Sequence, residues 1–83
     1  MSFTETGTDP RARDVAVSDA DLTVHLVDGR TLIAPLKWFP RLQSAAQDQR
    51  DAWELLGGGV GIHWPSIDED ISVAGLIRGK PAA

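Results

Sequence analysis

The chain has 83 residues, which is enough for one domain and too few for two. It contains no cysteine, so a disulfide and a cysteine-ligated zinc site are both excluded. Its 12 acidic and 8 basic residues give a formal net charge of −4, and the basic residues are scattered along the chain. This balance argues against nucleic-acid binding, because neutralising phosphates requires clustered lysines and arginines.

The sequence also bears on the compartment. No run approaches the ~20 apolar residues that span a bilayer, and the first residues have neither the basic region nor the apolar stretch of a signal peptide. The lack of cysteine fits a reducing compartment. We therefore expect a cytoplasmic protein that makes no membrane contact. Because so short a chain builds only a small core, self-association or a partner protein is the expected source of additional stability.

The first half of the domain is expected to be a β-meander. Residues 1–13 are polar and predict a flexible N-terminal tail, whereas residues 14–81 predict a single α+β domain. Residues 15–17, 22–27 and 30–34 alternate apolar with polar side chains, as strands with one buried face do. The Asp28-Gly29 pair between the last two strands is a strong signal for a hairpin turn. Pro35 should end the third strand, because it cannot donate a hydrogen bond to a ladder.

Three short helices are expected after the meander. Residues 37–45 space large apolar side chains about three apart, and residues 47–53 predict a second helix whose main core anchor is Trp53. A third helix over residues 73–78 is bounded by Ser72 as its N-cap and by Gly79 just after its end.

The segment before the last helix is expected to be irregular. Four glycines within residues 57–61 exclude a helix and favour a tight connection, residues 62–64 are extended, and residues 66–70 form an acidic loop. The expected fold class is α+β: a three-stranded antiparallel β-meander with short helices, followed by a C-terminal extended segment and a short helix.

No catalytic constellation is visible in the sequence. There is no cysteine nucleophile and no Gly-x-Ser-x-Gly elbow, and the glycine-rich segment is not followed by the Lys-Ser/Thr pair of a phosphate-binding loop. We expect neither enzymatic activity nor a bound cofactor. The chain is too short to offer much volume for a cleft beyond its core.

The weak candidates for a metal site are His63, Asp68 and Asp70. An imidazole and carboxylates together can bind a divalent cation. The competing interpretation, which we favour, is that Asp68, Glu69 and Asp70 form a solvated helix-entry loop and that His63 packs beside Trp64. The sequence alone assigns no metal site.

The acidity of the chain, its small size and its surplus of tryptophan point to a protein-interaction surface. Trp53 is expected in the core, whereas Trp38 and Trp64 are equally compatible with the core and with an interface, where tryptophan is enriched. Arg41 is a candidate for a clamp that ties the helical region to the acidic loop. The residues expected to take part in an interaction are Trp38, Arg41, Trp64, Asp68, Glu69 and Asp70.

Residues 54–79, ELLGGGVGIHWPSIDEDISVAGLIRG, closely resemble the family catalogued as domain of unknown function 2442. The segments VDGR at 27–30 and PLKWFPRL at 35–42 match as well, so the resemblance covers about residues 14–81. It implies a small bacterial α+β protein and supplies no catalytic residues. It also implies a pairing with a second small family, domain of unknown function 4160. That arrangement resembles a toxin–antitoxin pair, with this protein on the acidic, antitoxin-like side.

Three functional hypotheses follow. The first is a protein-interaction or antitoxin-like accessory module that binds another small protein encoded by a neighbouring gene, with a homo-oligomer as a further form of association. The alternative is a metal- or ligand-binding regulatory domain that uses His63 and the Asp68–Asp70 loop. A weaker alternative is an autoregulatory DNA-binding protein, which the acidic balance opposes.

Overall fold

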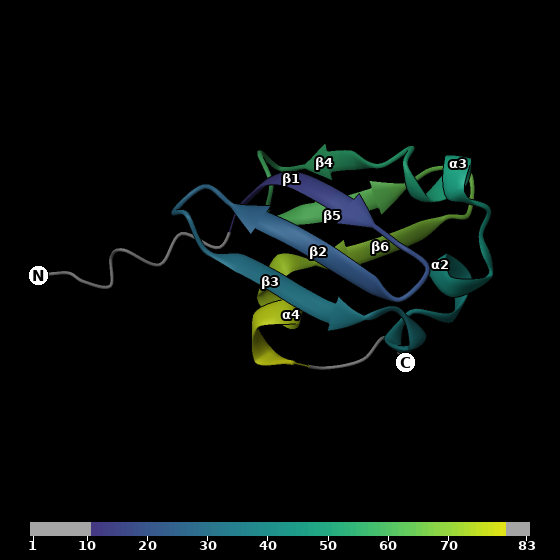
Figure 1. The fold of residues 1–83 in the computed structure, drawn as a ribbon. Coiled ribbons are helices and arrows are strands. Elements are labelled where there is room, and N and C mark those ends of the chain that lie inside the picture. The colour runs from purple at the N-terminus through teal and green to yellow at the C-terminus, as the bar shows by residue number, and fades with distance from the viewer. Residues whose placement is uncertain (1–10, 80–83) are drawn as a thin grey trace, which may run out of the picture.

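The computed structural model describes residues 11–79, and their first part is a three-stranded antiparallel sheet of order β1-β2-β3 (Figure 1). Its strands are β1 (Ala12–Val17), β2 (Asp21–Leu26) and β3 (Thr31–Pro35), so the predicted meander is confirmed. The hairpin at residues 27–30 is also confirmed. Gly29 has φ 96°, and the Leu26 amide donates to the Arg30 carbonyl oxygen over 2.8 Å.

The start of β1 corrects the predicted boundary between tail and domain. Ala12 is buried, and its amide donates to the carbonyl oxygen of Gly59 over 2.7 Å. This contact joins segments far apart in the sequence, so local polarity alone could not indicate it. The remainder of the predicted tail, residues 1–10, lies outside the described residues, as does the predicted end of the domain beyond residue 79.

The helix predicted over residues 37–45 is divided in two. A 3₁₀ turn, η1 (Leu36–Trp38), is followed by α2 (Pro40–Ser44), and Phe39 between them leaves the helical region with φ −127° and ψ 82°. The break has a simple cause, because a proline ring disfavours the helical conformation of the residue before it. Pro40 itself occupies the first helical position, where its missing N–H costs nothing.

The helix predicted over residues 47–53 is shorter than expected. It forms α3 (Gln47–Arg50) only. The carbonyl oxygen of Arg50, its last residue, accepts a hydrogen bond from the Trp64 indole Nε1 over 2.9 Å, which ties the end of the helix to β5. Trp53 therefore lies outside the helix and is only partly buried against the core, which corrects its predicted role as the main anchor.

The second part of the chain forms another three-stranded antiparallel sheet, of order β4-β5-β6. Its strands are β4 (Glu54–Leu56), β5 (Gly61–Trp64) and β6 (Glu69–Ser72). The extended segment at residues 62–64 is confirmed as the central strand. The acidic loop predicted over residues 66–70 is wrong at its end, because Glu69 and Asp70 belong to β6.

Helix α4 (Val73–Arg78) follows β6 directly, and both of its predicted caps are confirmed. The Ser72 Oγ accepts a hydrogen bond from the Gly75 amide over 3.2 Å, which satisfies one of the free donors at the helix N-terminus. Gly79 adopts φ 75°, the left-handed conformation that ends many helices. None of the helices in residues 11–79 is long and apolar enough to cross a membrane.

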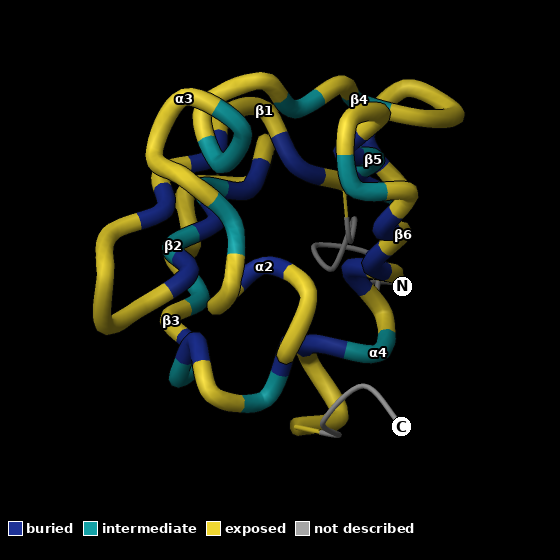
Figure 2. The backbone as a smooth tube through the Cα atoms, turned by 90° about the vertical axis from the view of Figure 1, so that its right-hand side faces the viewer, coloured by how far each residue is buried: buried dark blue, intermediate teal, exposed yellow. Residues whose placement is uncertain are grey.

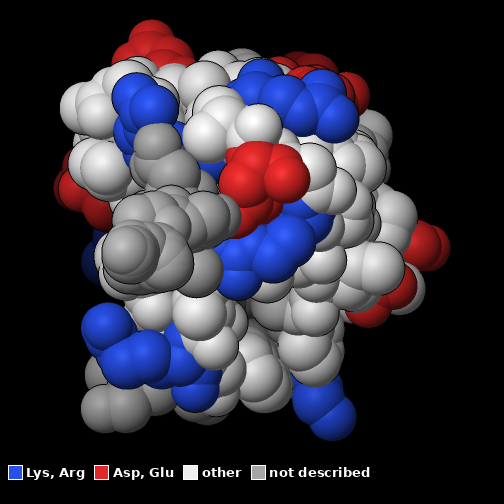
Figure 3. All heavy atoms as spheres, turned by 90° about the vertical axis from the view of Figure 1, so that its left-hand side faces the viewer, with Lys and Arg blue, Asp and Glu red and all other residues white. Residues whose placement is uncertain are grey.

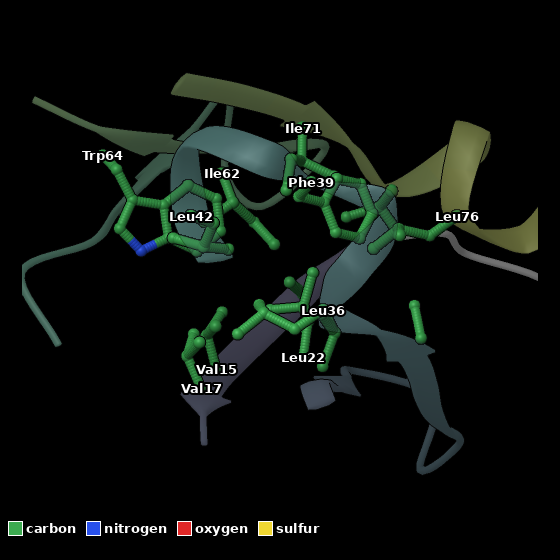
Figure 4. Packing of buried hydrophobic residues seen from close by; sticks show 14 of the residues in the cluster. Val15, Val17, Leu22, Leu36, Phe39, Leu42, Ile62, Trp64, Ile71 and Leu76 are labelled. Carbon is green, nitrogen blue, oxygen red and sulfur yellow. The ribbon is translucent and has the colours of Figure 1, made fainter. Parts of the chain in front are cut away.

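The two sheets face each other, and their buried faces enclose the core (Figures 1 and 2). Helix α4 contacts β3 of one sheet and β6 of the other, while α2 lies near the opposite end. Figure 4 shows side chains of both sheets and of the η1–α2 segment converging in one cluster. The largest fully buried side chains are Trp64, Phe39, Leu22, Leu26, Leu36, Leu42, Ile62, Val24 and Val73.

Two isoleucines on strands allow a matched test of this packing. Ile62 on β5 is 0% exposed and Ile33 on β3 is 67% exposed. We expect Ile62→Val to lower the free energy of unfolding by about 0.5–1.5 kcal/mol, because it removes a buried methylene. Ile33→Val should change it by less than about 0.5 kcal/mol. Urea denaturation measures both, and equal effects of the two substitutions would contradict the burial described here.

Candidate functional site

The outer face of the second sheet, the side turned away from the core, brings together an acid, a histidine and a second acid. Glu54 on β4 pairs with His63 on β5, and His63 pairs with Asp70 on β6. Since directly opposed residues of antiparallel strands lie on the same face, the three side chains form one row across the sheet. We call Glu54, His63 and Asp70 the acid–histidine row.

Within this row, His63 and Asp70 are in direct contact. The His63 Nδ1 forms a hydrogen bond with the Asp70 Oδ1, and the side chains are 25% and 68% exposed. The hydrogen bond to Asp70 raises the pKa of His63, partial desolvation acts in the opposite direction, and the negative charges of Asp70, Glu54 and Asp68 raise it further. The row therefore holds a proton on His63 more firmly than an isolated histidine would.

An apolar groove lies beside the acid–histidine row, with a volume of about 420 Å³. Leu56 pairs with Gly61, and Gly61 with Ser72, so these residues form the next row on the same outer face. Leu56 and Val60 are 41% and 51% exposed, although both are large and apolar. The residues that line the groove are Leu56, Val60, Gly61, Asp70, Ile71, Ser72 and Ala74.

The absence of a side chain at Gly61 keeps this groove open. Gly61 is not among the residues with positive φ. A Cβ placed on it would lie 3.6 Å from the Leu56 Cβ and 3.7 Å from the Ile71 carbonyl oxygen, which are ordinary contacts. The backbone therefore does not require glycine at this position, in contrast to Gly59, where a Cβ would overlap the carbonyl oxygen of Ala12.

The residues proposed as metal ligands from the sequence are only partly brought together. His63 meets Asp70, and Asp68 is near enough for its charge to act on the imidazole. Within residues 11–79, no group of three or more histidine, aspartate or glutamate side chains is arranged to hold a metal ion. The metal-binding alternative therefore finds no support in the geometry of this part of the chain.

The predicted clamp between Arg41 and the acidic segment is present. The Arg41 guanidinium donates to the Asp68 carbonyl oxygen over 2.7 Å and lies 4.0 Å from the Glu69 carboxylate. Glu69 points inward and is nearly buried, which raises its pKa, and the Arg41 charge partly opposes this effect. The clamp fixes α2 against the start of β6, so its role in the fold is positional.

The tryptophans that the sequence left open differ in exposure. Trp64 is 0% exposed in the core, where Figure 4 shows its ring beside Leu42, and it is therefore not a surface residue. Trp38 is half-buried and packs against the edge of the core. Of the residues predicted for an interaction, Asp68 and Asp70 are exposed and Asp70 lines the groove, whereas Glu69 faces inward.

The basic side chains do not form a continuous stripe on the end of the molecule drawn in Figure 3. Lysine and arginine atoms there lie in several separate groups, with acidic and uncharged atoms between them (Figure 3). Arg30, for example, is paired with Asp28 over 2.8 Å. This distribution does not favour the DNA-binding alternative, since a phosphate backbone requires a contiguous basic surface.

Seven residues of the row and the groove were not predicted as site residues from the sequence: Glu54, Leu56, Val60, Gly61, Ile71, Ser72 and Ala74. The first two lie on β4, which was not predicted as a strand. A signal was present, because an apolar pair precedes the glycine run and an alternating segment follows it, as in a hairpin with a glycine-rich turn. Gly57, Gly58 and Gly59 all adopt positive φ in that turn.

The comparisons with known proteins agree with one another. Residues 12–82 match the family described as protein of unknown function (DUF2442). A crystal structure of a protein of unknown function from Rhodospirillum rubrum is 36% identical, covers 92% of this chain and 94% of its own, and has a TM-score of 0.77. The solution structure of an uncharacterized protein from Chromobacterium violaceum is 21% identical, with coverage of 88% and 69% and a TM-score of 0.74, and supports the fold alone. No curated protein matches this sequence.

The proton on His63 can be followed directly by NMR titration. We expect a pKa above the ordinary histidine value, and we expect Asp70→Asn to lower it because it removes the largest cause of the shift. Glu54→Gln, which removes only a more distant charge, should lower it less.

The sign of the linked stability effect follows from the same shift. Because the folded pKa exceeds the unfolded one, the pair stabilises the fold below the unfolded pKa, and this contribution disappears as the pH rises through the folded pKa. Asp70→Asn should therefore lower the Tm more at pH 5.5 than at pH 8.5. A His63 pKa that does not respond to Asp70→Asn would contradict the arrangement.

The Arg41 clamp can be tested with a neighbouring lysine as its control. Arg41 is 63% exposed, so we expect Arg41→Ala to lower the free energy of unfolding by no more than about 1 kcal/mol. Lys37→Ala, also at an exposed position, should change it by less than about 0.5 kcal/mol. Chemical denaturation measures both values, and a larger loss for the lysine variant would show that the clamp is not the relevant contact.

Proposed function

The chain belongs to the DUF2442 family of proteins of unknown function, and we propose that it acts as a protein-interaction module that pairs with another small protein. The surface that we assign to this role is the outer face of the second sheet. There the apolar groove and the acid–histidine row lie side by side, and the proposal assigns no catalytic step to either of them.

The groove is the observation on which this proposal rests. A domain of 83 residues needs most of its large apolar side chains in its core, yet Leu56 and Val60 stay substantially exposed around one hollow. Apolar side chains gathered at the surface and bordered by polar groups are characteristic of protein interaction sites. An apolar side chain of a partner would displace water from this hollow and bury the exposed walls.

The negative charges around His63, beside the groove, favour a basic partner. Glu54, Asp68 and Asp70 are close enough to His63 for all three to influence its pKa, and the chain as a whole carries −4. Complementary charge accelerates association and selects against acidic partners. A symmetric contact between two copies through this face is disfavoured, because it would bring the same acids face to face.

The specific partner that we propose is a small protein of the domain of unknown function 4160 family encoded by a neighbouring gene, as the family resemblance implies. In that pairing this chain would be the acidic, antitoxin-like member. The apolar groove beside the acid–histidine row supports this assignment, because together they suit a basic protein with an exposed apolar side chain.

Filling the groove tests the proposal without disturbing the core. We expect Gly61→Val to weaken binding of the purified neighbour-encoded protein by at least about tenfold, which corresponds to about 1.4 kcal/mol. The side chain would occupy the groove, while the backbone accepts a Cβ and valine favours strands. Isothermal titration calorimetry gives the affinity and thermal denaturation the stability.

Ala16→Val is the matched control, since Ala16 is exposed on β1 of the other sheet. It should leave the affinity unchanged. No binding by the wild-type chain would refute the proposed pairing, and equal binding by wild type and Gly61→Val would refute the proposed surface.

A further inference from the structure

The groove and the acid–histidine row lie next to each other along the strands, two residues apart. Leu56 and Glu54 lie two residues apart on β4, as do Gly61 and His63 on β5. Residues two apart on a strand share a face and are about 7 Å from each other. An extended segment lying along these strands would therefore place side chains two positions apart over the groove and over the row.

The two positions offer different chemistry. The groove presents the apolar side chains of Leu56 and Val60, together with Ala74 from the first turn of α4. The row presents the carboxylates of Glu54 and Asp70 on either side of an imidazole. An apolar side chain suits the first position, and a cationic side chain suits the second.

We infer that this face recognises an extended partner segment in which an apolar residue is followed or preceded, two positions away, by Lys or Arg. This inference rests on the proposed function, and it names the feature of the partner that the surface would recognise: the spacing of an apolar and a basic side chain. The apolar side chain enters the groove, and the cation lies over His63 between the carboxylates of Glu54 and Asp70.

The charges facing His63 give this recognition a dependence on pH. They are the carboxylates of Glu54 on β4, Asp70 on β6 and Asp68 in the turn before β6. When the imidazole is neutral, the cation of the partner meets only negative charge at the row. When the imidazole is protonated, it adds a positive charge directly beneath that cation, so binding weakens as the pH falls.

Other occupants fit the surface less well. A nucleic acid or an anionic lipid surface would place phosphates against the carboxylates of the row. A metal ion is not favoured, because no three histidine, aspartate or glutamate side chains in residues 11–79, those of the row included, are arranged to hold one. A purely apolar segment would leave the row without a counter-charge, and the experiment below distinguishes this occupant from a cationic one.

The test uses the isotopically labelled full chain and two synthetic peptides in NMR titrations. Both are capped heptapeptides of glycine and serine with one leucine, and the residue two positions after the leucine is lysine in one and glutamate in the other. We expect the lysine peptide to shift amide signals of β4, β5 and β6, and to bind at least about fivefold more tightly than the glutamate peptide.

Variants of the row show which groups select the cation. Glu54→Gln and Asp70→Asn should each weaken the lysine peptide about two- to fivefold, as expected for exposed ion pairs. Asp14→Asn is the matched control, because Asp14 pairs with His25 on the other sheet, and it should have no effect. Lowering the pH from 8.5 to 5.5 should weaken the lysine peptide in wild type, and His63→Gln should remove this pH dependence.

The outcomes separate this inference from the proposed function. Equal binding of both peptides, no binding of either, shifts confined to other elements, or a pH dependence that persists in His63→Gln would each overturn the inference. If the neighbour-encoded protein still binds and Gly61→Val still weakens it, the proposed function stands while the inference falls. If neither that protein nor the peptides bind, both fall.

Discussion

Trp64 joins the two halves of the molecule, and much of the remaining structure depends on its position. Its ring is fully buried between the sheets, and its indole Nε1 donates to the Arg50 carbonyl oxygen. A buried indole must place its N–H on an acceptor, because an unsatisfied donor in the core costs about 1–3 kcal/mol. The bond ties the last residue of α3 to β5, close to the point where the chain enters β4. With β5 held inward at Trp64 and Ile62, the residues between and beside them must face outward.

The site follows from this constraint through the pleat of the second sheet. Once Ile62 and Trp64 face the core, His63 has to point away from it, and the register places Glu54 and Asp70 on either side. A slip of one residue would reverse every position, burying Asp70 and exposing Ile71. The acid–histidine row is thus a consequence of the same packing that stabilises the fold. The groove beside it depends on the same packing and, in addition, on the small residue at position 61 and on the exposed side chains of Leu56 and Val60.

The parts of this fold that could be predicted from the sequence are those whose signals are local. Alternation in residues 22–27, the Asp28-Gly29 turn, and the caps Ser72 and Gly79 each reflect the conformation of a few neighbouring residues. The parts that were missed depend on distant partners. β4 has only three residues, the last residue of α3 is bonded to an indole that comes 14 residues later in the chain, and β1 begins where Ala12 meets Gly59. The acid–histidine row could be predicted only in part for the same reason. His63 and Asp70 were candidates from the sequence, whereas placing Glu54 beside them requires the register of β4, a strand that was not predicted.

The three successive acids Asp68, Glu69 and Asp70 show how an acidic segment can be mistaken for a solvated loop. On a strand, successive side chains point to opposite faces of the sheet, and the sequence did not show that β6 begins here. As a loop, all three would be solvated. In the structure Asp68 occupies the turn with φ 53°, Glu69 points into the core, and Asp70 points outward to His63. Burial raises the pKa of Glu69, so its ionised form opposes folding, and the nearby Arg41 offsets part of that cost. The charged inward position hides the alternation of β6 from sequence analysis. The inward position of Glu69 also accounts for the position of the clamp. The Arg41 guanidinium contacts the Asp68 carbonyl oxygen and lies near the Glu69 carboxylate, at the point where the acidic segment enters the sheet.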